Sequence, residues 1–271
     1  MKLVRHHLIH KVSLHVVNNI YNFLADIRIR MSWRLLDTGI ADPFYVTAVD
    51  DAIAQARRQN ICSNTLHFYQ RHPAAVSIGR SRCVEDDVDV QQCNKNNVKI
   101  VRRTSGGGSI FTDQKCLIYS LVFNKKNLES TTPQAIFTHV CTTLVKSLQN
   151  SDIPTVYKPP NDLLLQGKKI SGSGLIIKDD VVLIHGTLLV DTNLELMSDV
   201  LKATPKTPAT TLTKELNYTP DISTMKTAFA KGFQGLFDTT FKKGTLTSYE
   251  KQLITTLLKA RYHNDQWNFM R

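Results

Sequence analysis

The chain has 271 residues, 42% of them hydrophobic and 21% charged, which is a globular composition and excludes an intrinsically disordered chain. It contains no apolar run of about 18 residues, which argues against a transmembrane helix. The formal net charge of +11 favours an anionic partner such as a nucleic acid, a nucleotide, a membrane surface or an acidic protein.

The first 30 residues differ from the rest of the chain. They are rich in basic residues and histidine and contain a single acid, Asp26. This composition fits a mitochondrial transit peptide. It equally fits a non-native start without structural role, because the sequence MSWRLLDTG places a natural start at Met31. We therefore expect an N-terminal extension over residues 1–30 and a folded domain over residues 31–271.

The five cysteines are odd in number, irregularly spaced and form no CxxC pair. A disulfide framework or a zinc site is therefore not expected. The pattern favours a reducing compartment, which predicts a cytoplasmic protein, or a mitochondrial one if residues 1–30 are a transit peptide.

From Trp33 onward, strand-like and helix-like segments alternate. Periodicity predicts strands over Trp33–Leu36, Thr65–Tyr69, Ala75–Ile78, Val98–Arg102, Cys116–Phe123, Asp162–Leu165, Lys169–Ser171 and Val181–Leu189, and helices over Tyr45–Arg58, Val88–Asn96, Pro133–Leu148, Leu194–Leu201, Ser223–Phe237 and Ser248–Arg261. Strands come in runs with helices between them, which predicts an α+β domain with a mixed β-sheet and flanking helices.

A glycine-rich loop follows one of these strands, in the segment VRRTSGGGSIFTD over Val101–Asp113. Consecutive glycines let backbone N–H groups approach and surround an anion. Arg102 and Arg103 precede the loop, and strand alternation directs only one of them at a ligand. A flexible hairpin turn with solvated arginines is the alternative interpretation.

Two further segments combine polar residues with strand patterns. In PNDLLLQGKKISGSG, alternation places Lys168 and Lys169 on opposite faces, so one lysine can point into a cleft, where it would supply a compact positive charge. In LIHGTLL, His185 interrupts an apolar strand. The alternatives are two exposed hairpin lysines and a buried, hydrogen-bonded histidine.

Together with Gly79-Arg80, these motifs occur in an order and at a spacing that resemble the large domain of lipoate–protein ligase A. The resemblance covers about residues 33–201. It implies the catalytic-domain fold shared with biotin ligases. It also implies an enzyme that activates lipoate with ATP and Mg²⁺ to lipoyl-AMP and transfers the lipoyl group to a lysine of an acceptor lipoyl domain. The implied acceptors are 2-oxoacid dehydrogenase E2 subunits or the glycine cleavage H protein, with neither nucleic acid nor membrane as partner.

The resemblance also carries over individual residues. Lys169 matches the catalytic lysine that contacts the lipoyl carbonyl and the α-phosphate, and Asp162 matches a residue near the metal. The residues implied to bind lipoate or lipoyl-AMP are Arg103, Gly106, Gly107, Gly108, Asn161, Asp162, Lys169, Gly174, His185 and Thr187. Val76, Ile78 and Ile110 are expected to line the groove for the apolar tail.

The sequence departs from this family at three places. Thr112 stands where a histidine is usual, Lys115-Cys116 where a Gly-Asn pair is usual, and Gly174 where alanine is usual. The chain ends where ligases of this family continue into a small accessory domain. We therefore expect that a separate accessory protein assists activation and docks at Trp267 and Phe269.

Three other functions compete with this interpretation. The first is a lipoyl or octanoyl transferase that takes a preformed activated acyl donor. Transferases of this family that form an acyl-enzyme have their cysteine just before the His-Gly pair or in the segment before the Lys-Ile-Ser-Gly strand. In this chain those places are Leu183-Ile184 and residues 157–160, which hold no cysteine, so this version of the enzyme is disfavoured. Cys116 is the nearest alternative cysteine. A biotin ligase fits the motifs poorly, and a basic nucleic-acid-binding protein is disfavoured because no aromatic-plus-basic motif is present.

Overall fold

The computed structural model describes residues 33–202 and 207–270. The predicted extension over residues 1–30 lies outside the described residues and stays a prediction. The strands are β1 (Trp33–Ala41), β2 (Thr65–Arg71), β3 (Ala75–Ile78), β4 (Lys99–Arg102), β5 (Ile110–Thr112), β6 (Cys116–Asn124), β7 (Thr155–Lys158), β8 (Asp162–Leu165), β9 (Lys168–Lys178), β10 (Val181–Leu189) and β11 (Phe241–Lys243). The helices are α2 (Pro43–Arg58), α3 (Val84–Asp87), α4 (Val90–Lys95), η1 (Lys125–Asn127), α5 (Pro133–Gln149), α6 (Leu194–Val200), α7 (Leu212–Leu216), α8 (Ile222–Leu236), α9 (Ser248–Leu257), η2 (Leu258–Tyr262) and α10 (Asp265–Asn268).

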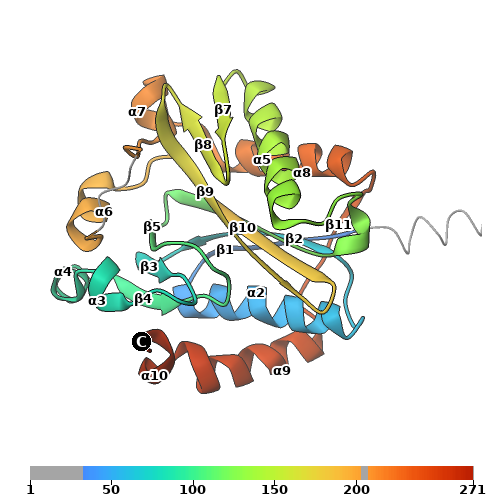
Figure 1. The fold of residues 1–271 in the computed structure, drawn as a ribbon, viewed down its shortest axis with the longest axis horizontal. Helices are drawn as coiled ribbons and strands as arrows, with labels where there is room; N and C mark the ends of the chain where they lie inside the picture. The colour runs from blue at the N-terminus through green and yellow to red at the C-terminus, as the bar shows by residue number, and fades with distance from the viewer. Residues whose placement is uncertain (1–32, 203–206, 271) are drawn as a thin grey trace, which may run out of the picture.

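The described part of the chain forms a large mixed sheet and a small one (Figure 1). The large sheet has eight strands in the order β11-β1-β2-β6-β10-β9-β8-β7, parallel where β1 pairs with β11 and β2 and antiparallel elsewhere. The small sheet has the order β4-β3-β5. The predicted α+β fold with a mixed sheet and flanking helices is confirmed.

Helices cover both faces of the large sheet, and strand alternation explains why. Along β10, Val182 and Ile184 point into the core under α5 and α8, whereas Val181 and Leu183 point into the core under α2 and α9. Successive side chains of a strand point to opposite faces, so a strand buried on both faces reads as a continuous apolar run. In Figure 1, α2 and α9 lie on one side of the sheet and α5 and α8 on the other.

Helix ends follow their capping residues. Helix α2 begins after Asp42, whose carboxylate accepts from the backbone N–H groups of Phe44 and Tyr45. Helix α9 begins with a capping box between Thr247 and Glu250. In the described part of the chain, no helix combines the length and apolarity needed to cross a membrane.

Candidate functional site

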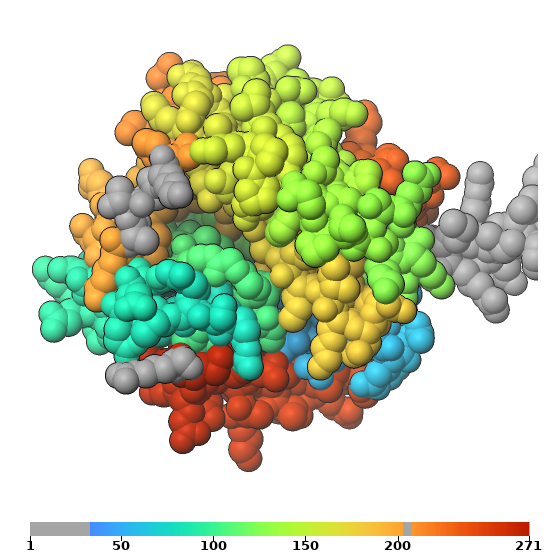
Figure 2. All heavy atoms as spheres, viewed as in Figure 1, coloured from blue at the N-terminus to red at the C-terminus, as the bar shows by residue number. Residues whose placement is uncertain are grey.

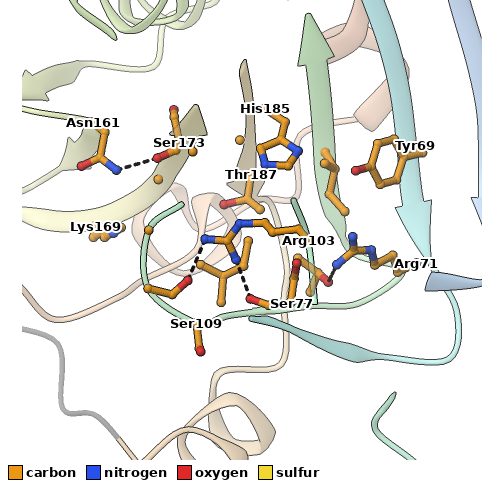
Figure 3. A pocket seen from close by; sticks show the side chains of 18 residues that line it. Tyr69, Arg71, Ser77, Arg103, Ser109, Asn161, Lys169, Ser173, His185 and Thr187 are labelled. Carbon is orange, nitrogen blue, oxygen red and sulfur yellow. Dashed lines mark hydrogen bonds between the residues drawn. The ribbon is translucent and has the colours of Figure 1, made fainter. Parts of the chain in front are cut away.

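The site is a cavity of about 120 Å³ between the glycine loop and strands β2, β3, β9 and β10 (Figure 3). Its lining residues are Tyr69, Arg71, Ser77, Arg103, Gly107, Gly108, Ser109, Ile110, Thr112, Ile118, Asn161, Lys169, Gly172, Ser173, Gly174, His185, Gly186 and Thr187. A second cavity, of about 260 Å³, shares Ser109, Ile110 and Lys169 with the first. Figure 2 shows the surface hollowed between the yellow β8–β9 segment and the blue-green segments that precede and contain the glycine loop.

The adjacent residues Arg102 and Arg103 point in opposite directions, as strand alternation predicts. Arg103 points into the cavity, where its guanidinium donates to the carbonyl oxygens of Ser77 (2.7 Å), Gly106 (2.8 Å) and Gly108 (2.8 Å). Burial lowers the pKa of Arg103 to about 10, so the side chain stays charged at neutral pH. Arg103 therefore holds the glycine loop against β3 as well as bordering the cavity.

Arg102 points the opposite way and holds the C-terminal segment. Its fully buried guanidinium donates to six carbonyl oxygens, including those of Trp267 (3.0 Å) and Met270 (2.8 Å). The guanidinium groups of Arg80 (4.3 Å) and Arg261 (4.5 Å) lie over the indole ring of Trp267. Trp267 is half-buried in these contacts and Phe269 is exposed, and the expectation that a separate protein docks at these two residues stays a prediction.

Among the predicted glycines, Gly107 has the strongest reason to be glycine. Its φ is +98°, and an added Cβ would lie 2.9 Å from Arg103 Nη2. At Gly79, an added Cβ would lie 2.0 Å from the Gly107 carbonyl oxygen, so the loop contacts the β3 end closely. Gly106 and Gly108 have open space around an added Cβ and ordinary φ values.

The two lysines of β9 also separate as predicted. Lys169 Nζ lies 2.6 Å from Asp162 Oδ1 and close to Gly172, where an added Cβ would be 2.9 Å from it. Lys169 lines both cavities. Lys168 instead pairs with Glu215 at 2.9 Å outside the cavity. Only Lys169 is placed to meet a ligand.

Asn161 fixes the turn that precedes this ion pair. Its side-chain amide donates to the Ser173 carbonyl oxygen at 2.6 Å, which ties the start of β8 to β9. Gly174, the next residue along β9, leaves room for the glycine loop, because an added Cβ would lie 3.2 Å from the Gly106 carbonyl oxygen. Thr187 on β10 lines both cavities beside Lys169.

His185 belongs to a buried network behind the cavity. Its Nε2 lies 2.6 Å from Ser105 Oγ, and its Nδ1 lies 3.5 Å from Asp50 Oδ2. The same carboxylate contacts His67 Nδ1 at 2.9 Å and accepts from the Tyr69 hydroxyl at 2.9 Å. A carboxylate only accepts, so both histidines carry a proton on Nδ1, and a neutral His185 accepts from Ser105 at Nε2.

Burial and hydrogen bonding shift the pKa values in this network. Burial alone would raise the pKa of Asp50, but hydrogen bonds from His185 and His67 outweigh burial and hold it below its usual value. Burial lowers the pKa of His185. The network therefore contains an ionised Asp50 and a neutral His185 at neutral pH, which fixes the orientation of Ser105 at the start of the glycine loop.

The wall of the cavity is more polar than the sequence predicts. Val76 and Ile78 do not line the cavity, because both belong to the hydrophobic core packed against the small sheet. Ser77, which lies between them on β3, lines the cavity instead. The predicted alternation along β3 was correct, but the face predicted to meet the cavity was wrong. Only Ile110 of the three expected apolar residues is in the lining.

Several residues of the site were not predicted from the sequence, among them Tyr69, Arg71, Asp50 and Ser105. Tyr69 and Arg71 alternate along β2, whose last two residues, Gln70 and Arg71, lie beyond the predicted strand. Asp50 lies in the apolar run of α2 and could have been recognised as an acid on a buried helix face. Ser105 is completely buried at the start of the glycine loop.

The magnesium ion expected at Asp162 stays a prediction. Asp162, the expected ligand, is paired with Lys169, and the cavity lining contains no carboxylate. No group of three or more histidine, cysteine or acidic side chains within residues 33–202 and 207–270 is arranged to hold a metal. Because Mg²⁺ in nucleotide sites is held by one or two carboxylates together with phosphate oxygens and waters, Asp162 would be the residue to hold it.

No cysteine lines either cavity among the described residues. Cys116 is buried, and burial raises its pKa far above the usual value, which leaves no reactive thiolate. Cys141 Sγ lies 3.9 Å from the Ser173 hydroxyl, but burial raises its pKa to about 11. No cysteine of the described residues is therefore placed at either cavity, and the expectation that cysteine catalysis is disfavoured stays a prediction.

Comparison with known proteins identifies relatives of the whole domain. The family described as lipoyl protein ligase A/B catalytic domain matches residues 42–234. The octanoyltransferases LipM of Clostridioides difficile and Symbiobacterium thermophilum are each 28% identical and are covered over 99% of their length, by 88% and 89% of this chain.

Solved structures share the fold over the same extent. A bi-partite lipoate protein ligase of Thermoplasma acidophilum, described with its E2 lipoyl domain, has a TM-score of 0.80 at 25% identity, with 88% of this chain and 96% of that chain covered. A lipoate-protein ligase A bound with ATP has a TM-score of 0.79 at 25% identity, with 88% and 99% covered.

Proposed function

We infer that the chain, which belongs to the lipoyl protein ligase A/B catalytic domain family, is an acyltransferase that takes a preformed activated acyl donor. It transfers a lipoyl or octanoyl group to a lysine of an acceptor lipoyl domain. The motifs alone favoured the ATP-dependent ligase, but the eight relatives compared are all octanoyltransferases matched over 98–99% of their length. The comparisons therefore support the transferase, which the sequence left as the alternative.

The observation that carries the proposal is the position of Lys169 at the junction of the two cavities. The first cavity suits the acyl chain, because its inner end, at the buried residues Tyr69 and Arg71, is shielded from solvent. The second suits the leaving group of the donor. Its described lining contains a single cation, Lys169, and no carboxylate, which is poorly matched to a magnesium-bound triphosphate and supports a donor activated beforehand.

The reaction needs one bond to form and one to break. The acceptor amine attacks the acyl carbon, a C–N bond forms, and the bond from the acyl carbon to the leaving group breaks. The leaving group departs with the bonding electron pair and takes up the proton that the amine releases. Negative charge that develops on the carbonyl oxygen would be stabilised by the Lys169 ammonium, which Asp162 holds at 2.6 Å.

The surroundings of the site complete the proposal. The glycine loop, held by Arg103, would exclude water from the acyl chain, and Asn161, Gly174, His185 and Thr187 would shape its walls. The net charge of +11 suits an acidic acceptor domain. A donor that is already activated requires no adenylation, so the separate accessory protein expected from the sequence is not required.

The test supplies the acyl group in two ways. The purified chain and an acceptor lipoyl domain are mixed with octanoyl-adenylate or an octanoyl thioester in one set of reactions. In the other set, the acyl source is octanoate with ATP and Mg²⁺. We expect the acceptor mass to increase by one octanoyl group in the first set alone. An acceptor whose target lysine is replaced by methionine is the control. Equally fast modification from octanoate and ATP would show a ligase instead, and no modification from any donor would refute the proposal.

A further inference from the structure

The buried end of the acyl cavity is closed by an arginine. Arg71 is the last residue of β2, is 4% exposed and lines the cavity. Its Nη1 donates to Thr112 Oγ1 at 3.2 Å and its Nη2 to Thr47 Oγ1 at 2.9 Å. Its Nε is buried and has no hydrogen-bond partner among the described residues. One donor of a side chain that lines this end of the cavity therefore lacks a hydrogen-bond partner.

The cavity has a clear direction from its mouth to this end. The side chain of Lys169 is 31% exposed, whereas Tyr69 and Arg71 are almost completely buried. Among the lining residues drawn in Figure 3, Asn161 and Lys169 lie on one side, Tyr69 and Arg71 lie on the other, and Arg103, His185 and Thr187 lie between them. An acyl chain with its carbonyl at Lys169 would therefore have its far end at Arg71.

The two arginines of the cavity have no direct ion-pair partner. No carboxylate of the described residues forms an ion pair with Arg71 or Arg103. The nearby Tyr69 hydroxyl already donates to Asp50 and offers no further proton to a ligand. A methyl group against Arg71 would leave its Nε–H buried and unpaired, which is unfavourable, whereas an electron-rich atom would accept from it.

We propose that Arg71 recognises the far end of the acyl chain and makes the enzyme prefer a lipoyl group over an octanoyl group. The dithiolane sulfur atoms of a lipoyl group are polarisable, weak hydrogen-bond acceptors, which an alkyl end lacks. Arg71 is then a specificity-determining residue of the first cavity. This inference rests on the proposed function, because it takes that cavity as the acyl site.

The test measures binding apart from transfer. Calorimetry compares lipoamide with octanamide, two neutral product analogues, on the wild type, Arg71→Met and Arg71→Lys. We expect the wild type to bind lipoamide roughly tenfold or more tightly than octanamide, as one hydrogen bond from a charged donor allows. Both variants should lose most of this ratio, since methionine removes the charge and lysine removes the Nε–H.

Arg58→Met is the matched control, because Arg58 lies outside the acyl cavity and is half-buried at the surface. It should keep the wild-type ratio, and melting curves identify any variant that fails to fold. Equal binding of the two amides by the wild type, or an unchanged ratio in the folded Arg71 variants, would overturn the inference. An Arg71-dependent ratio in a protein that transfers no acyl group would refute the proposed function and leave only the binding preference at Arg71 in place.

Discussion

Replacing Lys169 with alanine, with Lys168→Ala as the matched control, tests the chemistry of the site most directly. The two lysines are neighbours on β9, yet Lys169 lines both cavities and Lys168 pairs with Glu215 outside the first. A unit charge about 4 Å away at an effective dielectric constant of about 20 contributes roughly 4 kcal/mol. Partial exposure of Lys169 and its ion pair with Asp162 reduce that figure.

We therefore expect Lys169→Ala to lower kcat by about 10²–10³, the range typical of losing one group that stabilises an oxyanion. Lys168→Ala removes a partly exposed ion pair worth about 0–1 kcal/mol of folding stability, so its kcat should stay near that of the wild type. The assay follows octanoyl transfer from octanoyl-adenylate to a lipoyl domain by mass spectrometry under single-turnover conditions. Equal losses in the two variants, or a loss confined to KM, would refute the assigned role of Lys169.

Three further changes test the loop, the C-terminal segment and the buried network. Gly107→Val should weaken donor binding without unfolding the protein, since φ is +98° and the new Cβ would meet Arg103; an unchanged Kd in calorimetry would contradict this. Arg102→Met removes hydrogen bonds to six carbonyl oxygens. The free energy of unfolding should fall by about 3–5 kcal/mol, as when other buried polar networks are broken, which lowers Tm by roughly 6–20 °C. An unchanged Tm would show that these hydrogen bonds of Arg102 are not needed for stability. Because Asp50 has a lowered pKa, its ionised form stabilises the folded state above the usual pKa of 3.8 and loses this effect as the pH falls. Asp50→Asn should therefore be less stable than the wild type at pH 7, with a gap in unfolding free energy that narrows below about pH 4 in denaturant titrations; a pH-independent gap would argue against an ionised Asp50.

The parts of the fold predicted from the sequence are those with strong periodicity. The long helices α2, α5, α8 and α9 and the apolar strands β6 and β10 were found near their observed bounds, because each buries a continuous face. The short strands β5, β7 and β11 and the short helices α3, α7 and α10 were missed, whereas α4 and α6 were predicted. Segments of three to five residues have too little periodicity of their own, and their structure depends on pairing with distant parts of the chain.

The same distinction explains the site. The opposite directions of Arg102 and Arg103, and of Lys168 and Lys169, follow from alternation along one strand, which is a local property. The polar wall of the cavity does not follow from any one strand, because Asp50 on α2, Tyr69 on β2 and His185 on β10 meet only after the sheet has formed. Alternation along β3 was recognised, but which face met the cavity depended on the packing of the small sheet beneath it.

The distribution of charge around the cavity bears on how the reaction is accelerated. Arg71 and Arg103 are buried beside the proposed acyl chain, which is neutral in the donor, so their charge contributes to holding the chain only through the hydrogen bond proposed for Arg71. Negative charge appears only when the amine attacks the carbonyl and the leaving group departs. Fixed positive groups in a water-excluding cavity stabilise that state more than the ground state and require little reorganisation. Lys169 lies nearest the reacting atoms in this arrangement. Asp50, ionised behind the cavity wall and hydrogen-bonded by His67, Tyr69 and His185, compensates part of that positive potential without forming an ion pair with either arginine.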